Sequence, residues 1–448
     1  MYKRQGGTTT APSELESKLF ASSKMAPCPA VIAASPYGDV YAGVELQGSL
    51  GTKINKGYIT KLVDTDNDGK ADKHTVYTKV DNPRGILSIG DRLIVLHSTV
   101  KNGKRGNQQL SVFVDADNDG EADGEAKPLI TNLGNSKYLK SRGADHSTNN
   151  IRLGIDGWIY ISVGDFGFIN AEGSDGTKLS LHGGGIVRVR PDGSELETFV
   201  TGTRNVYDIA IDPYMNVFTR DNTNDHGEWW TRFNHYIQSA DYGYPNLYTH
   251  FPEDMLPALA EYGSGSGTGC LYFEEPGWPA KYNKVTMTAD WGRSQIYIHR
   301  LTQDGASFRD KMESFIDSTQ VTDLDVDGSG RMYIAAWDGA GYKGNVSKGF
   351  VSVVTPKGWT YKPFPNLKTL KADALLSLLK QPSSTTRVYA QQEILRRNEA
   401  AYLPQLEGIA NDTSASSESR VAAVYTLAQL AGADAQPCLL YTSPSPRD

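Results

Sequence analysis

Several features are scarce in this 448-residue chain, and each scarcity excludes a class of protein. Only Cys28, Cys270 and Cys438 are cysteines, and their spacing fits neither a zinc site nor a disulfide framework. Cys28 and Cys270 either form one bridge or remain free buried thiols. No apolar run approaches the ~18 residues of a membrane-spanning helix, and no signal peptide is visible. The net charge is −7 without a basic stripe, so we expect no nucleic-acid partner.

The two ends of the chain match neither neighbouring pattern. Residues 1–5 and 438–448 resemble translated read-through of sequencing adapters, so we expect the first residues and residues 437–448 to be non-native. Residues 1–27 as a whole are predicted to form a disordered lead-in. On this interpretation both natural termini are missing, and the absence of a signal peptide carries no information about location.

Short runs of alternating apolar and polar residues are frequent, in a composition with 45 Gly, 24 Tyr and 7 Trp. Such runs are typical of β-strands and favour an all-β protein. One hairpin pattern recurs along the chain: a turn of Asp, Gly or Pro joins an apolar strand to an aromatic-rich strand. Its copies lie at residues 33–41, 86–95, 153–160, 209–218 and 324–334, with a divergent copy at 285–298. A second strand pair follows each hairpin, which predicts a six-bladed β-propeller over residues 28–362. A β-sandwich explains this grouping less well.

Residues 363–436 change to apolar spacing typical of helices. The sequence Arg387-Val388-Tyr389-Ala390 is echoed by Arg420-Val421-Ala422-Ala423, which suggests paired helices. We therefore predict an all-β six-bladed β-propeller followed by a short all-α HEAT-like helical segment. Such helical repeats commonly offer a surface to a protein partner.

Two acidic loops share one spacing of carboxylates, with Asp at positions one, three, five and nine and Gly at position six. The spacing matches the front of a calcium-binding loop, but Thr75 and Ala126 replace the Glu that completes an EF-hand. We predict a structural Ca²⁺ in each loop, because carboxylates packed this closely repel one another without a counterion. A metal-free Asp/Asn/Gly turn is the alternative. The predicted ligands are Asp64, Asp66, Asp68 and Asp72 in the first loop, and Asp115, Asp117, Asp119 and Asp123 in the second.

The stretch at residues 145–165 places Asp145-His146 just before the third recurring hairpin. Arg204-Asn205 occupies the corresponding place before the fourth hairpin. Equivalent strand entrances in a propeller converge on the central axis. We therefore expect a His, an Arg and an Asn to face one pocket, together with the acidic stretch at residues 219–228.

The order of these motifs resembles the glucose/sorbosone dehydrogenase family: Asp-His, a hairpin ending in Gly-Asp, Gly-x-Arg-Asn, and an acidic loop leading to Tyr-Gly-Tyr-Pro at residues 242–245. Proteins of that family are six-bladed quinoproteins that use pyrroloquinoline quinone (PQQ) and Ca²⁺. The added helical segment resembles Planctomycetes-type membrane-bound-dehydrogenase domain proteins. The resemblance implies a dehydrogenase that oxidises a sugar or other alcohol, an electron acceptor such as a cytochrome c, and a periplasmic or extracytoplasmic location. The chain has no Cys-x-x-Cys-His motif, so we expect no haem to be attached to it.

The resemblance also implies a role for each matching catalytic residue. His146 is the general base that takes a proton from a substrate hydroxyl, a task that suits a neutral imidazole. Asp145 holds either the substrate or His146. Arg204 and Asn205 contact the quinone and stabilise the charge that develops on its oxygens.

Further positions concern the cofactor and its metal. Backbone carbonyls near Asn222 and Thr223 are implied to bind a Ca²⁺ that polarises the reacting carbonyl. Arg293 matches a cationic position facing the cofactor. Gln320 stands near the place where the family has an Arg that grips the cofactor carboxylates, and Gln lacks a charged two-pronged donor. Phe166-Gly167-Phe168 predicts an apolar rim to the pocket.

Two other functions remain open on sequence grounds. One is a non-catalytic propeller that binds carbohydrate or a protein partner and has lost cofactor binding. The other is a Ca²⁺-dependent lactonase or hydrolase, whose central metal would need converging carboxylates. Asp145, Asp165, Asp221 and Asp323 are the candidates for such a set.

Overall fold

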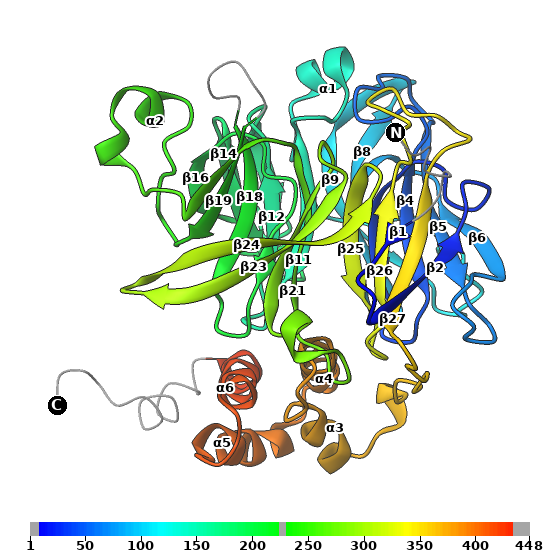
Figure 1. The fold of residues 1–448 in the computed structure, drawn as a ribbon, viewed down its shortest axis with the longest axis vertical. Helices are drawn as coiled ribbons and strands as arrows, with labels where there is room; N and C mark the ends of the chain where they lie inside the picture. The colour runs from blue at the N-terminus through cyan, green and yellow to red at the C-terminus, as the bar shows by residue number, and fades with distance from the viewer. Residues whose placement is uncertain (1–8, 224–229, 433–448) are drawn as a thin grey trace.

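A computed structural model describes residues 9–223 and 230–432 of the protein. Its β-strands form six sheets arranged as the blades of a propeller, with a few helices at the C-terminal end (Figure 1). The predicted fold class, a six-bladed β-propeller followed by a short helical segment, is confirmed. No helix among the described residues is both long and apolar enough to cross a membrane. Residues 224–228, Cys438 and the suspected non-native ends (1–5 and 437–448) lie outside the described residues.

The blades follow one another along the chain, and each begins with its innermost strand. Blade one contains β3 (Pro29–Ala34), β4 (Val40–Glu45), β5 (Gly57–Val63) and β6 (Lys73–Thr78). Blade two contains β7 (Asp81–Ile89), β8 (Arg92–Lys101), β9 (Lys104–Val114) and β10 (Lys127–Thr131), extended by β13 (Phe168–Gly173) and β14 (Lys178–Leu181). Blade three contains β11 (Thr148–Leu153), β12 (Ile159–Val163), β15 (Gly184–Val189) and β16 (Glu197–Thr203).

The other three blades complete the ring. Blade four contains β17 (Ala210–Ile211), β18 (Val217–Thr223), β19 (Trp230–Tyr236) and β20 (Ala260–Ser264). Blade five contains β21 (Gly267–Phe273), β22 (Val285–Asp290), β23 (Gln295–Asp304) and β24 (Ser307–Ser318), with β1 (Thr9–Thr10) at its edge. Blade six contains β25 (Val321–Val326), β26 (Met332–Ala336), β27 (Phe350–Pro356) and β2 (Leu15–Ala21).

Two predictions about the strands were wrong. The segment 1–27, predicted to be a disordered lead-in, contains β1 and β2, and β2 pairs with β27 to complete blade six. The N-terminus thus closes the ring, a pairing that local periodicity does not reveal because its partner lies near residue 350. The divergent hairpin at 285–298 is β22–β23, the second and third strands of its blade, and β21 is the innermost strand there.

Cys28 and Cys270 are both buried and free, which settles the two alternatives for this pair. Cys28 immediately precedes the innermost strand of blade one, and Cys270 lies on the innermost strand of blade five. Each thiol has its own partner: the Cys28 Sγ lies 3.2 Å from the Asn345 carbonyl oxygen and the Cys270 Sγ lies 3.7 Å from the Thr219 hydroxyl. Burial raises the pKa of both thiols.

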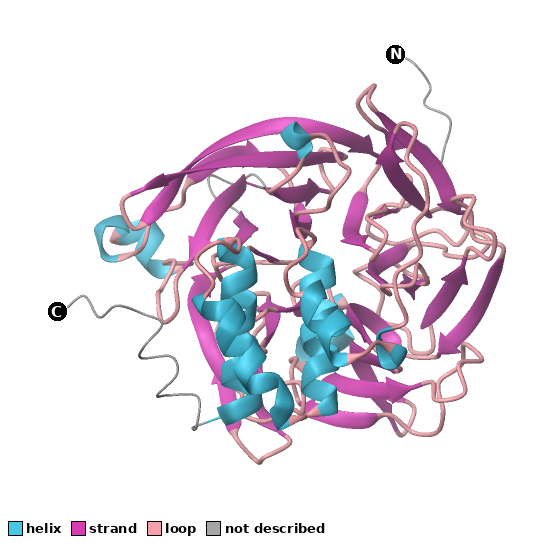
Figure 2. Cartoon of the chain, turned by 90° about the horizontal axis from the view of Figure 1, so that it is seen from below, coloured by secondary structure: helices cyan, strands magenta, loops and turns pink. Residues whose placement is uncertain are grey.

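The C-terminal helices lie across one end of the ring, which we call the lower end (Figure 2). The helices there are α3 (Ala372–Leu378), α4 (Ser384–Arg397), α5 (Leu403–Asn411) and α6 (Ser417–Ala431), with short 3-10 turns at Leu367–Thr369 and Ala400–Tyr402. Their apolar core contains Leu375, Ile394 and Leu427 and reaches Ile155 of blade three. The Tyr389 hydroxyl also donates to the Ala34 carbonyl of blade one, at 3.1 Å. The helices therefore pack on the propeller as one body with it.

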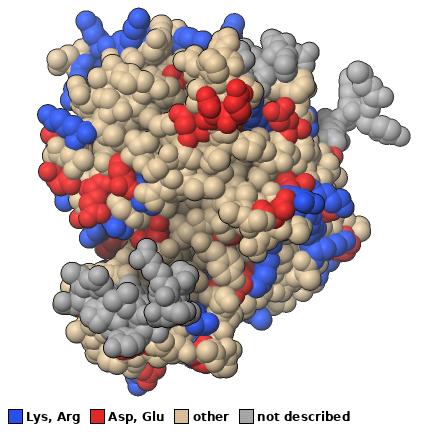
Figure 3. All heavy atoms as spheres, turned by 90° about the vertical axis from the view of Figure 1, so that its left-hand side faces the viewer, with Lys and Arg blue, Asp and Glu red and all other residues tan. Residues whose placement is uncertain are grey.

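The opposite, upper end carries α1 (Ser136–Arg142), and the chain enters each innermost strand from this end (Figure 1). Helix α2 (Asn246–His250) and a 3-10 turn at Pro252–Asp254 lie beside blade four, and another 3-10 turn spans Ala280–Tyr282. On the face drawn in Figure 3, Lys and Arg side chains lie in small groups separated by acidic and uncharged ones.

Candidate active site

His146 lies at the upper end, in the loop between α1 and the innermost strand of blade three. Its main chain is held tightly, because the His146 carbonyl accepts the Phe166 N–H and a Cβ at Gly164 would come within 2.4 Å of that carbonyl oxygen. The imidazole Nδ1 is 2.6 Å from Oδ1 of Asp165, and Nε2 is 3.6 Å from Oδ2 of Asp145. His146 is thus flanked by two carboxylates, of which only Asp145 was predicted to hold it.

An aromatic stack supports this imidazole. The Phe166 ring is stacked on His146 with centroids 5.4 Å apart, and Tyr138 of α1 stacks on Phe166 at 4.6 Å. The Arg142 guanidinium lies 5.7 Å from the Phe166 centroid, within the range of a cation–π contact. The sequence Phe166-Gly167-Phe168 therefore places one apolar ring beside the His146 imidazole.

Arg204 and Asn205 lie beside His146, as their matching strand entrance predicted. The side-chain amide of Asn205 donates to the Asp145 carbonyl at 3.3 Å, and Asn205 forms a β-bridge with Gly164. The Arg204 guanidinium lies 3.4 Å from the Asn222 carbonyl through Nη1 and also contacts the Tyr244 side chain. The structure therefore brings His146, Asp145, Arg204 and Asn205 together from blades three and four.

Asp221 fixes the Arg204–Asn205 turn. Its carboxylate accepts both main-chain N–H groups, from Arg204 at 3.2 Å and from Asn205 at 3.0 Å. Burial raises the Asp221 pKa to about 6, although these two N–H groups oppose the shift. The sequence suggested Asp221 only as a metal ligand. Its partners Arg204 and Asn205 lie one strand earlier in the chain, and no local sequence pattern reveals this contact.

Asn222 and Thr223, the predicted calcium-binding positions, are buried at the end of β18. Both residues are in register with β19, opposite Thr231 and Trp230. The Asn222 side-chain oxygen is buried and has no hydrogen-bond partner among the residues that the structure describes. The prediction named backbone carbonyls, and the Asn222 carbonyl lies 3.4 Å from the Arg204 guanidinium. The Asn222 side-chain oxygen is a further donor of a type suited to Ca²⁺.

Arg293 and Gln320, the other predicted cofactor contacts, are engaged by the protein itself. The Arg293 guanidinium donates to the Ser264 carbonyl at 2.6 Å and to the Tyr262 carbonyl. The side-chain oxygen of Gln320 accepts the Gly341 N–H at 3.1 Å. Of these two residues, only Arg293 has guanidinium donors taken by the protein's main chain, because Gln320 bonds through its oxygen.

A buried polar cluster beside blade two was missed by sequence reasoning. Arg84 is 1% exposed and donates from Nη1 to the Tyr207 hydroxyl at 3.1 Å. Its Nε and Nη2 have no hydrogen-bond partner within the described part of the chain. Glu45 is fully buried and accepts from the Asn82 amide at 2.5 Å. Burial raises the pKa of Glu45 to about 7, while Arg84 opposes that shift. A lone Arg after Pro83 gave no local signal for this position.

The two acidic loops have nearly the same geometry and lie between the outer strands of blades one and two. In each, three carboxylates offer oxygens within 4.8 Å of one another: Asp64, Asp66 and Asp72 in the first loop, and Asp115, Asp117 and Asp123 in the second. The predicted ligands Asp68 and Asp119 stand outside these groups, and their carboxylates accept the N–H groups of Lys70 and Glu121 at 2.8 Å.

Each acidic loop also holds a cation from the preceding blade. Arg331 of blade six lies 3.0 Å from Asp64, and Lys61 of blade one lies 3.7 Å from Asp115. Main-chain hydrogen bonds link the same blades. The Ala71 N–H donates to the Phe20 carbonyl of blade six, and the Ala122 N–H donates to the Tyr77 carbonyl of blade one. The loops therefore join neighbouring blades. One oxygen of Asp115 is buried and has no hydrogen-bond partner in residues 9–223 and 230–432.

The carboxylates proposed for a lactonase centre do not gather around one point. Asp165 is bonded to His146, Asp221 to the Arg204–Asn205 main chain, and Asp323 lies 3.3 Å from the Arg152 guanidinium. Within residues 9–223 and 230–432, three potential metal ligands come together only in the two acidic loops.

The propeller was compared with proteins of known structure and with curated proteins. The propeller fold resembles an oxidoreductase (glucose dehydrogenase) from Thermus thermophilus, at 13% identity and TM-score 0.54, covering 76% of this chain and all of that one. It also resembles the PQQ-bound aldose sugar dehydrogenase from Streptomyces coelicolor, at 16% identity and TM-score 0.52, covering 77% of this chain and all of that one. A search of curated proteins found no match.

A family model described as "Domain of unknown function (DUF7133)" matches residues 8–323. The chain belongs to this family. The matched region begins just before β1 and ends within β25, so it contains His146, Arg204 and Arg293.

Proposed function

We propose that the protein is a quinone-dependent dehydrogenase that oxidises a sugar or other alcohol at the His146 site. The observation that carries the proposal is the hydrogen bond between His146 Nδ1 and Asp165. An ionised carboxylate only accepts, so Nδ1 carries the proton and Nε2 is left with its lone pair. A neutral imidazole in this tautomer is a general base.

The proton that Nε2 accepts is stabilised by its surroundings. Asp165 on one side and Asp145 on the other place two carboxylates against the imidazolium. The Phe166 ring limits rotation of the imidazole, so its lone pair keeps one direction. His146 therefore takes the hydroxyl proton, and Asp165 acts as its positioning residue.

Arg204, Asn205 and Asn222 are the residues that would hold the quinone and its Ca²⁺. The Arg204 guanidinium offers charge to an anionic cofactor, and the buried Asn222 side-chain oxygen offers a ligand to the metal. PQQ would supply the hydride acceptor for the reaction. Asp221 would keep Arg204 and Asn205 in place through their main-chain N–H groups. Electrons would then pass to an acceptor such as a cytochrome c, in a periplasmic or extracytoplasmic setting.

A non-catalytic binding propeller is the second candidate. It is favoured by the bonds of the Arg293 guanidinium to the protein's own main chain, because a triply anionic quinone then finds fewer free donors. The HEAT-like helical segment would in that case serve a protein partner.

Reconstitution with PQQ and Ca²⁺ tests the proposal. Cofactor binding is measured by titration, and turnover by dye reduction with a panel of aldoses and alcohols. We expect binding and turnover in the native protein, and binding without turnover in His146→Ala. Absence of cofactor binding would contradict the dehydrogenase, and intact dye reduction in His146→Ala would remove His146 from the mechanism.

A further inference from the structure

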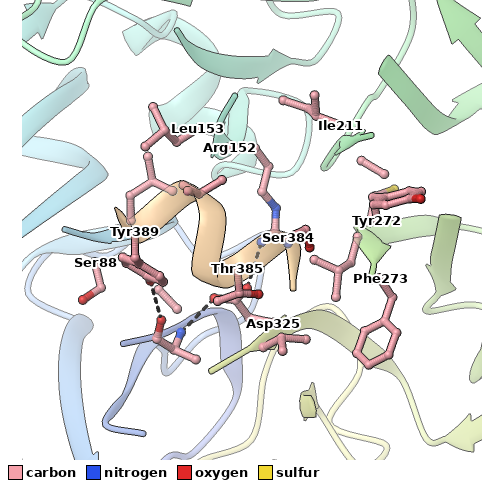
Figure 4. A pocket seen from close by; sticks show the side chains of 18 of the residues that line it. Ser88, Arg152, Leu153, Ile211, Tyr272, Phe273, Asp325, Ser384, Thr385 and Tyr389 are labelled. Atoms are coloured by element: carbon pink, nitrogen blue, oxygen red, sulfur yellow. Dashed lines mark hydrogen bonds and ion pairs between the residues drawn. The ribbon is translucent and has the colours of Figure 1, made fainter. Parts of the chain in front are cut away.

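A cavity of about 170 Å³ lies at the lower end of the ring, between the innermost strands and helix α4 (Figure 4). The chain enters the innermost strands from the upper end, so His146 and this cavity lie at opposite ends of the central channel. Ile86, Leu153, Ile209 and Phe273 contribute apolar walls, and Val388 of α4 lines the cavity from the side of the helices. The cavity is therefore a separate space that the helical segment covers.

The upper wall of the cavity carries more carboxyl groups than cationic groups. Arg152 of blade three contacts three carboxylates: Asp208 at 2.6 Å, Asp323 at 3.3 Å and Asp325 at 3.4 Å. One guanidinium therefore faces three carboxyl groups. Burial raises the pKa of all three, and Arg152 opposes each shift. When all three carboxyls are ionised, the single Arg152 guanidinium does not balance their negative charge.

Asp325 is the carboxylate that a ligand can reach. Its side chain is 20% exposed, whereas the side chains of Asp208 and Asp323 are fully buried. One Asp325 oxygen accepts the Ala34 N–H at 2.8 Å, and the other lies 3.4 Å from the Arg152 guanidinium. The Val326 N–H also contributes a hydrogen bond to this carboxylate. Asp325 therefore has capacity to accept a further donor from inside the cavity.

The rest of the lining adds no second cation. Among the described residues that line the cavity, Arg152 is the only basic one, and Glu274 and Glu275 add further carboxyls. Glu274 is paired with Arg387 and lies 3.2 Å from Lys284, while Glu275 accepts from the Thr385 hydroxyl at 2.6 Å. Burial raises the pKa of Glu275 to about 7. Asp325 is therefore the carboxylate with the weakest partners.

We propose that this cavity binds a small organic amine, with its ammonium group against Asp325 and its apolar body between the inner strands and α4. An ammonium donates three hydrogen bonds and adds the positive charge that the Arg152 cluster lacks. The volume suits a body of six to eight non-hydrogen atoms, since an apolar protein cavity of roughly 150 Å³ binds benzene. Because α4 forms part of the wall, the ligand strengthens the contact between the helices and the propeller.

Ligand-dependent thermal unfolding of the full chain tests this site with three probes of similar shape. Benzylamine carries the charge, benzyl alcohol is its neutral counterpart, and benzoate carries the opposite charge. We expect benzylamine alone to raise the melting temperature in a concentration-dependent way. Equal stabilisation by benzyl alcohol, stronger stabilisation by benzoate, or no shift with benzylamine would each overturn the proposal.

Two variants test whether the stabilisation by benzylamine arises in this cavity. Asp325→Asn keeps an oxygen to accept the Ala34 N–H and removes the charge, and we expect the benzylamine Kd to rise at least tenfold. Ser88→Leu fills the cavity from a residue of its lining, and we expect it to abolish binding. Asp254→Asn, at an exposed position, is the matched control. Benzylamine binding that persists unchanged in both cavity variants, with native circular dichroism, would place the amine elsewhere and refute the site. None of these readouts depends on dehydrogenase activity.

Discussion

The His146 Nδ1 atom lies 2.6 Å from Oδ1 of Asp165, a residue that follows the second strand of the same blade. The hairpin β11–β12 returns the chain to the upper end, so a residue before its first strand meets one after its second. This pairing selects the tautomer of His146 and gives the imidazole its direction. It is the geometric basis of the proposed dehydrogenase.

Asp165→Asn should lower kcat for dye reduction by about 10- to 100-fold, because an amide donor facing Nδ1 favours the opposite tautomer and weakens the base. Nitrogen NMR of the imidazole should show the proton moving to Nε2, a change that does not depend on turnover. Glu172→Gln, at an exposed position on β13, is the control and should leave both readouts unchanged. A native tautomer in Asp165→Asn would contradict this role of Asp165.

Calcium should stabilise the protein through the two acidic loops. Where free Ca²⁺ exceeds the Kd about 100-fold, mass action predicts a gain of about 2.7 kcal/mol for each occupied site. Asp66→Asn and Asp117→Asn remove one carboxylate from each loop, and the double variant should lose the response to Ca²⁺ in calorimetry. If the native protein unfolds at the same temperature in Ca²⁺ and in EDTA, the loops are metal-free turns held by Arg331 and Lys61.

Arg331→Met should lower the free energy of unfolding by about 3–5 kcal/mol, because it leaves buried carboxylates unpaired. Arg331 lies 3.0 Å from Asp64 and 2.7 Å from Asp327, and all three side chains are at most 2% exposed. Arg309→Met removes an exposed ion pair with Asp304 and should cost at most about 1 kcal/mol. Urea unfolding of the two variants measures the contrast, and equal losses would argue against the inter-blade role of Arg331.

Glu45 should make the protein less stable as the pH rises. Its pKa is raised from 4.5 to about 7 by burial, so the folded state holds the proton more tightly than the unfolded state. The stabilisation is complete below pH 4.5 and is lost as the pH rises through 7, a change of about 3 kcal/mol for such a shift.

Glu45→Gln removes this titration and should flatten the stability profile. Relative to the native protein, the variant should become more stable by about 3 kcal/mol between pH 4.5 and pH 8. Asp221 and Glu275 have raised pKa values in both proteins, so their contributions cancel in the difference. Parallel profiles for the two proteins would show that Glu45 does not titrate in this range.

The predicted site depended on repetition along the sequence. Because the hairpin recurs, Asp145-His146 and Arg204-Asn205 were predicted to occupy equivalent strand entrances, and the structure brings them together. Asp165 as the partner of His146 and Asp221 as the support of Arg204 were missed, because each lies across a hairpin from the residue that it holds. Arg84 and Glu45 were missed for a related reason, since burial of a charged group depends on the other blades.

The sequence by itself determined the class of the fold, because strand alternation and turn residues are local and repeat with a fixed order. It also determined the acidic loops, whose carboxylates lie close together in one turn. Tertiary structure alone decided how the N-terminal strand β2 closes blade six, which carboxylates hold His146, and that α4 covers a charged cavity. These relationships join residues far apart in the chain, and their energies depend on burial that only the closed ring creates.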